Sequence, residues 1–241
     1  MVRENASPCQ QCLTQNEIKE AVGKKAASLV KEGMLVGLGS GTTAVYFIKH
    51  LGARCRAGLK IQAVSSSMQS LKIAEEEGIP TVEMDRAASI DIDLMVDGAD
   101  EVDPQKRVIK GGGGAHSREK IIATSSREMI VVVDESKLVD QLGKFGLPVE
   151  ILSFGYLATI AKIEKMGYQG KLRLNQQDGS LVKTDNENYI FDINYPTRFP
   201  DPEKDHDLIK KIPGVVETGF FFGLPVKVLV GYKDGKVAFR E

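Results

Sequence analysis

Short apolar runs alternate with helical patterns in the first half of the chain, and this alternation constrains the fold more than any other feature. The apolar runs cover residues 34–38, 61–64, 93–96 and 129–133. Unbroken apolar runs of this length are typical of strands that are buried on both faces. A helical pattern precedes them at residues 14–33, and others lie between them at 45–51, 68–77 and 117–125. The sequence therefore predicts an α/β fold, a Rossmann-like parallel sheet with helices on both faces.

Polar clusters follow several of these strands at the point where each one ends. They occupy residues 40–43, 65–67, 97–100 and 134–137. In an open parallel sheet, ligands bind beyond the carboxyl ends of the strands. We therefore expect the four clusters to meet in a single site.

The turn after the first strand, Gly39-Ser40-Gly41-Thr42-Thr43-Ala44, leads directly into a helix. A strand, a glycine turn and a helix together point free N–H groups and a helix dipole at a phosphate. A dinucleotide fingerprint would need glycine where Thr42 stands, and no P-loop lysine follows. The turn favours a phosphate monoester, with Ser40, Gly41, Thr42 and Thr43 as candidate ligands. A plain helix cap is the alternative.

The loop Lys110-Gly111-Gly112-Gly113-Gly114 is followed by an acid at Glu119. Four glycines add nothing to a core, but they allow a ligand to lie against bare backbone. Asp97 and Asp100 lie just upstream. Three carboxylates and a lysine around such a loop favour proton transfer on a small, hydroxyl-rich, anionic molecule. A surface loop with solvated charges is the alternative.

The pattern changes after residue 148. A helix at 156–166, strands at 171–175 and 189–194, a helix at 202–212 and a strand at 215–222 predict a smaller α+β (ferredoxin-like) domain with a β-α-β-β-α-β order. A closing hairpin at 226–232 and 236–239 is expected to return to the first domain. A short strand is also expected at 81–84. The predicted domains are 1–12, a disordered extension; 13–148 with 224–241, the Rossmann-like catalytic domain; and 149–223, the α+β domain.

The composition of the 241 residues excludes several classes of protein. With 32 basic and 33 acidic residues the net charge is −1, so no basic surplus indicates nucleic acid or an anionic membrane. Cys9 and Cys12 form a lone C-x-x-C, and the three histidines are scattered, so no metal site is expected. No apolar stretch is long enough to cross a membrane. We expect a soluble, cytoplasmic protein.

Several motifs, in this order, resemble those of the type A ribose-5-phosphate isomerase family. They are Gly37-Leu38-Gly39-Ser40-Gly41-Thr42-Thr43-Ala44, Val64-Ser65-Ser66-Ser67, Val96-Asp97-Gly98-Ala99-Asp100-Glu101, Ile109-Lys110-Gly111-Gly112-Gly113, Ser117-Arg118-Glu119-Lys120-Ile121-Ile122, Asp134-Glu135-Ser136-Lys137, Gly143-Lys144-Phe145-Gly146-Leu147-Pro148-Val149-Glu150 and Ile212-Pro213-Gly214-Val215-Val216. They extend from about Leu13 to the end of the chain.

The resemblance implies an aldose–ketose isomerase of the non-oxidative pentose phosphate pathway. It would interconvert D-ribose 5-phosphate and D-ribulose 5-phosphate through an enediolate, without metal or organic cofactor, as a homodimer or homotetramer. Glu119 is implied as the general base. Asp97, Gly98, Ala99, Asp100 and Lys110 are implied at the sugar, and Gly111, Gly112 and Gly113 at the developing oxyanion. Ser40, Gly41, Thr42, Thr43, Lys137 and Lys19 are implied at the phosphate. From spacing alone, Lys19 is an ordinary solvated residue on a helix.

The sequence departs from the family pattern at Gly114 and His116, where small or apolar residues are expected, and mildly at Ser117. His116 is expected at a loop or interface position rather than as a base. Two other hypotheses are an amino-sugar-phosphate deaminase or lactonase on a similar fold, and a sugar-phosphate sensor of a transcription regulator. The Lys110–Glu119 loop speaks against the first, and the absence of a DNA-binding module speaks against the second.

Overall fold

The computed structural model describes residues 13–87 and 91–240. In chain order its elements are α1 (Gln15–Ala27), β1 (Leu35–Leu38), α2 (Thr42–Arg56), β2 (Gln62–Ser65), α3 (Met68–Glu76), α4 (Met84–Ala87), β3 (Leu94–Asp97), β4 (Glu101–Val102), β5 (Val108–Ile109), α5 (His116–Thr124), β6 (Met129–Asp134), η1 (Glu135–Lys137), β7 (Leu147–Ile151), α6 (Tyr156–Lys165), β8 (Gln169–Leu172), β9 (Tyr189–Tyr195), α7 (Pro202–Lys210), β10 (Val215–Thr218), β11 (Phe220–Phe221), β12 (Val226–Gly231) and β13 (Val237–Arg240).

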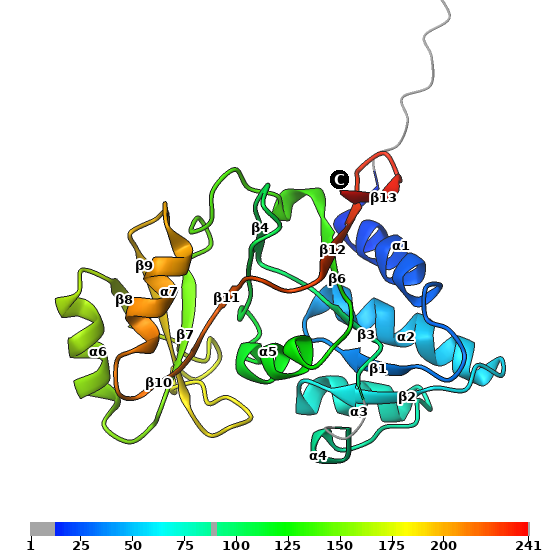
Figure 1. Cartoon of the computed structure of the whole chain (residues 1–241), viewed down its shortest axis with the longest axis horizontal. Coiled ribbons are helices and arrows are strands. Elements are labelled where there is room, and N and C mark those ends of the chain that lie inside the picture. The colour runs from blue at the N-terminus through cyan, green and yellow to red at the C-terminus, as the bar shows by residue number, and fades with distance from the viewer. Residues whose placement is uncertain (1–12, 88–90, 241) are drawn as a thin grey trace, which may run out of the picture.

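A six-stranded sheet, here the large sheet, has the order β13-β12-β6-β3-β1-β2. All neighbours are parallel except β13, which runs antiparallel to β12. Because side chains alternate across a strand, Ile130 and Val132 face α1, α2 and α3, while Val131 and Val133 face α5. Helices therefore cover both faces, as predicted, and the closing hairpin returns to this sheet (Figure 1).

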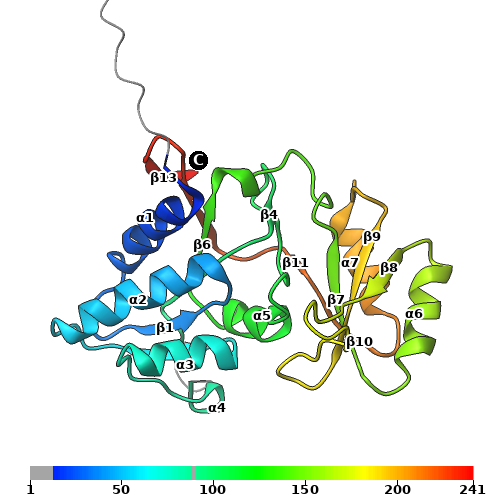
Figure 2. The same ribbon diagram turned by 180° about the vertical axis from the view of Figure 1, so that it is seen from behind.

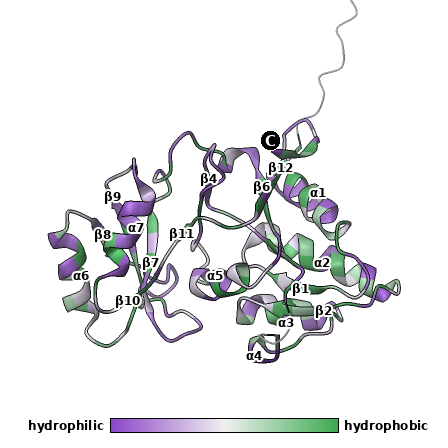
Figure 3. Cartoon of the chain, viewed as in Figure 1, coloured by the Kyte–Doolittle hydropathy of each residue, from purple (hydrophilic) through white to green (hydrophobic). Residues whose placement is uncertain are grey.

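A four-stranded antiparallel sheet, here the small sheet, has the order β10-β7-β9-β8. Together with α6 and α7 it has the predicted β-α-β-β-α-β order, a ferredoxin-like arrangement. Both helices lie on the side away from the large sheet (Figures 1 and 2). Hydrophobic colouring follows β6 and β12 in the large sheet, and α6 and α7 carry hydrophilic stretches (Figure 3). The division into two domains, 13–148 with 224–241 and 149–223, stays a prediction.

A third sheet, β11-β5-β4, lies between the other two. The single strand expected at 215–222 is wrong, because the chain changes sheets at Gly219. The Gly219 N–H donates to Pro148 at 2.7 Å, and its carbonyl accepts from the Lys110 N–H at 2.8 Å. A Cβ at Gly219 would lie 2.2 Å from the Lys110 carbonyl oxygen, so this crossing requires glycine. The crossing anchors the start of the glycine loop to the small sheet.

Two further expectations need correction. The strand expected at 81–84 is wrong: Thr81 forms only an isolated bridge with Ala63, and helix α4 begins at Met84. The first helix begins with the expected capping box at Thr14 but ends at Ala27 instead of residue 33. The predicted extension 1–12, with Cys9 and Cys12, lies outside the described residues. No helix among the described residues is long and apolar enough to span a bilayer.

Candidate active site

The turn between β1 and α2 forms one wall of the site. Gly41 has φ of 90° and precedes the first turn of α2, whose N–H groups remain free of any side-chain cap. A Cβ at Gly39 would lie 2.1 Å from the Asp97 carboxyl, so only glycine allows β1 and β3 to end this close together. The Ser40 hydroxyl contacts the hydroxyls of Ser66 and Ser67, both at 2.9 Å. Three of the four clusters expected to meet, at 40–43, 65–67 and 97–100, thus lie side by side, but the serines at 65–67 do not line the cavity described below.

Asp97 ends β3 and is fully buried. Its Oδ1 accepts the backbone N–H groups of Ser40 at 3.0 Å and Gly98 at 2.7 Å. Its Oδ2 lies 2.9 Å from the Lys110 Nζ. Burial raises the pKa of Asp97, while the Lys110 ammonium opposes that rise. Asp97 therefore holds both the turn after β1 and the Lys110 ammonium in place.

Lys110 and Glu119 form a buried ion pair at the end of the glycine loop. The Lys110 Nζ lies 3.2 Å from Glu119 Oε2 and donates to the Gly98 carbonyl at 2.6 Å. Both side chains are almost completely buried. Burial, reinforced by the Asp97 charge, raises the pKa of Glu119 to about 8, against the opposing effect of Lys110. Burial lowers the pKa of Lys110, but the facing carboxylates outweigh it and the net shift is upward.

Asp100 is fixed by the glycine loop. Its Oδ2 accepts the Gly112 N–H at 2.7 Å, and a Cβ at Gly112 would lie 2.6 Å from its Oδ1. Gly111 has φ of 108° and passes between His116 and Pro148, where a Cβ would lie 2.8 Å from the His116 ring. These two glycines allow the backbone to lie against a carboxylate on one side and a packed ring on the other.

Ser117 does not cap α5 as expected. Helix α5 begins at His116, and the Ser117 hydroxyl instead donates to the buried Glu150 carboxylate on β7. Glu150 also accepts from Thr184 at 2.7 Å, Asn188 at 2.9 Å and Asn186 at 3.1 Å. The carboxylate thus ties the first turn of α5, which carries Glu119, to the small sheet. Glu150 lies in one of the motifs that resemble the family, but its sequence position predicted no role for it.

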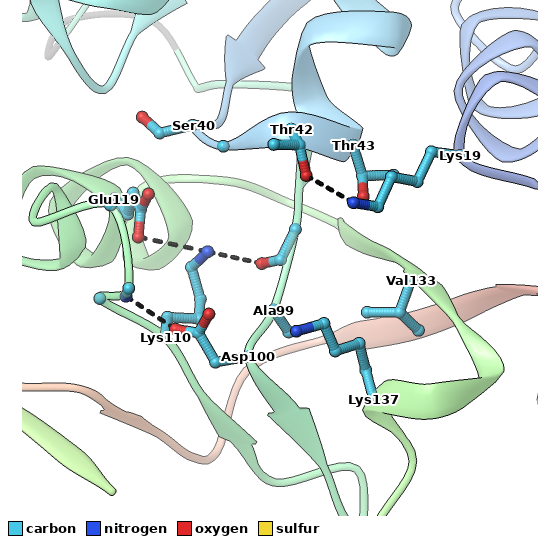
Figure 4. A pocket seen from close by; sticks show the side chains of 15 residues that line it. Lys19, Ser40, Thr42, Thr43, Ala99, Asp100, Lys110, Glu119, Val133 and Lys137 are labelled. Carbon is cyan, nitrogen blue, oxygen red and sulfur yellow. Dashed lines mark hydrogen bonds and ion pairs between the residues drawn. The ribbon is translucent and has the colours of Figure 1, made fainter. Parts of the chain in front are cut away.

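Two lysines lie at the opposite end of the site from Glu119 (Figure 4). Lys19 on α1 donates from Nζ to the Thr42 hydroxyl at 3.0 Å. Lys137 ends η1, directly after β6, and its side chain extends toward the same cavity. Lys19 is therefore placed beside the N-terminus of α2, which the spacing along its helix did not indicate.

A pocket of about 560 Å³, open to solvent, joins these groups. Of the site residues predicted from the sequence, all but Asp97 line it; they are Lys19, Ser40, Gly41, Thr42, Thr43, Gly98, Ala99, Asp100, Lys110, Gly111, Gly112, Gly113, Glu119 and Lys137. Asp97 lies behind Lys110 and supports it. Val133, which was not among the predicted site residues, adds one apolar wall. In the described ranges 13–87 and 91–240, no cluster of three histidine, cysteine or acidic side chains is placed to hold a metal ion.

His116 lies beneath the glycine loop and outside the cavity lining. Its side chain is fully buried, with Nε2 3.3 Å from the Glu217 carbonyl and no hydrogen-bond partner for Nδ1 among the described residues. Burial lowers the pKa of His116 to about 4, so the ring is neutral near pH 7. A loop or interface position was expected for His116; the structure instead places it at the first residue of helix α5, with a buried side chain.

Comparison with known proteins gives one consistent family. The family model described as ribose 5-phosphate isomerase A (phosphoriboisomerase A) matches residues 62–235. The chain is 50% identical to ribose-5-phosphate isomerase A of Protochlamydia amoebophila, covering 90% of this chain and 92% of that protein. The solved enzyme of Methanocaldococcus jannaschii superimposes with a TM-score of 0.88 at 40% identity, covering 95% and 100% of the two chains. A D-ribose-5-phosphate isomerase solved in complex with phospho-erythronic acid matches with a TM-score of 0.88 at 37% identity, covering 95% of this chain and 100% of that one.

Proposed function

The chain belongs to the ribose 5-phosphate isomerase A family, and we propose that its cavity interconverts D-ribose 5-phosphate and D-ribulose 5-phosphate with Glu119 as the general base. The family match favours the isomerase over the deaminase, lactonase and regulator hypotheses. The roles of the individual cavity residues given below are part of this proposal.

One observation carries this assignment: a buried carboxyl and a phosphate-type anchor occupy the two ends of one cavity. Glu119 lies beside Lys110 at one end. The α2 N-terminus, Lys19 and Lys137 lie at the other. An anchored phosphate fixes the distance from the far end of a five-carbon chain to the base, and positioning of this kind can lower a barrier by several kcal/mol.

The proposed reaction moves one carbon-bound proton and one hydroxyl proton. Glu119 removes the proton from C2 of the open-chain aldose. The electrons of that bond form the C1–C2 double bond, and the π electrons of the C1 carbonyl move onto O1, giving an enediolate. Glu119 then returns the proton to C1, while the O2 proton passes to O1, giving the ketose. Such a base works best when its pKa lies near the working pH, as burial of Glu119 provides.

The enediolate needs fixed donors near its two oxygens. Lys110 and the backbone of the glycine loop line that end of the cavity and fit this role. Asp100 lines the cavity while Asp97 does not, so we assign to Asp100 the hydroxyl proton that moves during ring opening. Asp97 is assigned the supporting role, keeping Lys110 charged beside the reacting carbons.

A coupled assay that follows ribulose 5-phosphate formed from ribose 5-phosphate tests the function, with Glu119→Gln as the decisive variant. The amide keeps the shape of the side chain but takes up no proton, so we expect kcat to fall by about 10²–10⁴. The wild-type rate is expected to be unchanged by a chelator. Inhibition by inorganic phosphate should change by less than about twofold, because the anchor is intact.

An active Glu119→Gln variant with near wild-type kcat would contradict the assignment of the base. A homodimer or homotetramer, and a cytoplasmic location, are proposed on the family resemblance alone. Sedimentation velocity of the full chain checks the first of these.

A further inference from the structure

Arg173 reaches across from the small sheet and binds the glycine loop from outside the cavity. It follows β8 directly and donates from Nη1 to the Gly111 carbonyl at 2.8 Å and to the Gly112 carbonyl at 3.0 Å. Asp192 on β9 fixes the guanidinium, accepting from Nε at 2.8 Å and also from Nη2. Only 17% of the Arg173 side chain is exposed, and it does not line the cavity.

These contacts set the direction of two peptide groups. In a trans peptide the carbonyl and the next N–H point in opposite directions. With the Gly111 carbonyl turned toward Arg173, the Gly112 N–H is turned away, and it meets Asp100 at 2.7 Å. With the Gly112 carbonyl turned toward Arg173, the Gly113 N–H is likewise turned away from the guanidinium. Gly113 lines the cavity, and a Cβ built there would meet no atom within 4 Å.

Within the loop, the Gly114 N–H also donates to the Gly111 carbonyl at 3.0 Å, while the Gly112 carbonyl accepts from Arg173. Glycine populates more backbone conformations than any other residue and loses the most entropy when fixed. Gly111 and Gly112 accept bonds from one rigid planar group that is itself held by a carboxylate. A lysine could not replace it, since an ammonium lacks the fixed fork that binds Asp192 and two carbonyls together.

We propose that Arg173 is a positioning residue of the isomerase, which orients the Gly112 and Gly113 N–H groups toward Asp100 and the substrate oxygen. This inference rests on the proposed function, because the Gly113 N–H would donate to an oxygen of the enediolate formed in that reaction. Arg173 acts through the backbone and touches no substrate atom.

The test compares wild type, Arg173→Met and Arg198→Met in the coupled assay. Arg198 also donates to a backbone carbonyl, that of Gln141, but does not line the cavity. Loss of one oxyanion donor costs about 10²–10³ in kcat, and misplacement of a group by about 1 Å costs up to about 10²-fold. We therefore expect Arg173→Met to lower kcat about 10- to 100-fold and Arg198→Met to leave it within about twofold.

Two inhibitors separate positioning from general damage. Phospho-erythronic acid carries a carboxylate at the end of the chain away from its phosphate, so its inhibition constant should rise about tenfold in Arg173→Met. Inorganic phosphate binds only the far end, and its inhibition constant should stay within about twofold. A collapsed fold would weaken both ligands together.

If the wild type is active and the kcat of Arg173→Met is within about twofold of the wild-type value, the inference about Arg173 is overturned while the proposed function stands. A raised KM with an unchanged kcat would also overturn it, since that would place Arg173 in substrate binding. An inactive wild type would contradict the proposed function and the inference with it. If Arg173→Met does not fold, Asp192→Asn, which loosens the guanidinium but leaves it in the chain, decides by the same criteria.

Discussion

Glu119 is buried near one cation, Lys110, and two other acids, Asp97 and Asp100, and the balance among these charges sets its protonation. Burial and Asp97 raise its pKa, and Lys110 opposes them, leaving a value of about 8. Burial lowers the pKa of Lys110, but the carboxylates of Asp97, Glu119 and Asp100 outweigh burial, so Lys110 keeps its proton. The cavity without substrate therefore holds a fixed positive charge beside a carboxyl that titrates close to neutral pH.

The pH dependence of kcat/KM follows from this value. Glu119, the proposed base, must be deprotonated in the free enzyme, so kcat/KM should rise by up to about tenfold between pH 7 and pH 9 and level off above the pKa of about 8. The substrate phosphate, with a second pKa near 6, is a dianion across this range and adds no change of its own. A profile that is flat from pH 7 to pH 9 would contradict the raised pKa.

His116 is a residue whose titration acts on stability. Its pKa is about 4 in the folded chain and about 6.5 when unfolded, so the folded state resists a proton that the unfolded state accepts. Its contribution is present above pH 6.5 and is lost as the pH falls toward 4. His116→Leu should therefore reduce the loss of Tm between pH 7 and pH 5, by the equivalent of about 1–2 kcal/mol.

Thermal unfolding of wild type and His116→Leu at the two pH values checks this expectation. His50→Leu is the control, because His50 is partly exposed and meets Glu20 at 3.7 Å on the surface. An equal loss of Tm in wild type and His116→Leu would contradict a neutral buried ring.

At the scale of elements, the proposed phosphate anchor is assembled from two neighbouring helices and a third element that follows much later in the chain. Helix α1 supplies Lys19, the N-terminus of α2 supplies free N–H groups and hydroxyls, and η1 supplies Lys137. They meet because β1 and β6 are parallel strands of one sheet, whose carboxyl ends lie at the same edge. The anchor therefore depends on the register of the sheet more than on any one loop.

Lys137→Ala should weaken substrate binding without slowing the chemical step. A charge-assisted contact is worth about 1.5–3 kcal/mol, so KM for ribose 5-phosphate should rise about 10- to 100-fold with kcat nearly unchanged. Steady-state kinetics measures both. Lys144→Ala, at an exposed lysine outside the cavity lining, is the matched control. An unchanged KM in Lys137→Ala would remove that residue from the anchor.

Across the whole molecule, Glu150 joins helix α5, which carries the proposed base, to the small sheet. Four side chains donate to its carboxylate, from Ser117, Thr184, Asn186 and Asn188. Burial raises its pKa, but these donors outweigh burial and the net shift is downward. Its contribution to stability is thus present above pH 4.5 and is lost as the pH falls through the lower pKa of the folded state.

Glu150→Gln should destabilise the chain. The NH2 group of the glutamine would replace one acceptor oxygen, so it would face side-chain donors that then lack an acceptor. Each unsatisfied buried group costs about 1–3 kcal/mol, which corresponds to a fall in Tm of roughly 3–10 °C for a protein of this size. Thermal unfolding at pH 7 measures the change. Glu164→Gln, at an exposed site on α6, is expected to shift Tm by less than about 1 °C. A stable Glu150→Gln variant would show that the four donors find other partners.

The sequence predicts the sheet and the cavity well because both depend on local patterns. Apolar runs mark the strands, and the polar turns after them mark the edge where Ser40, Asp97 and Lys137 gather. The strand expected at 81–84 failed because four residues contain too little periodicity to exclude a helix start at Met84. Glu150 contacts Ser117, and Arg173 contacts Gly111, across about 30 and 60 residues of sequence. No local spacing predicts contacts at such separations.

The large sheet is completed out of sequence order. Strand β12 lies in it between β6 and β13, parallel to β6 over six residue pairs, yet the whole of the small sheet separates β6 from β12 along the chain. During synthesis of the chain, the edge of β6 that pairs with β12 therefore has no partner strand until β12 has been made. A product cut after residue 148 would keep every cavity residue and still present an open apolar strand, which is a template for aggregation.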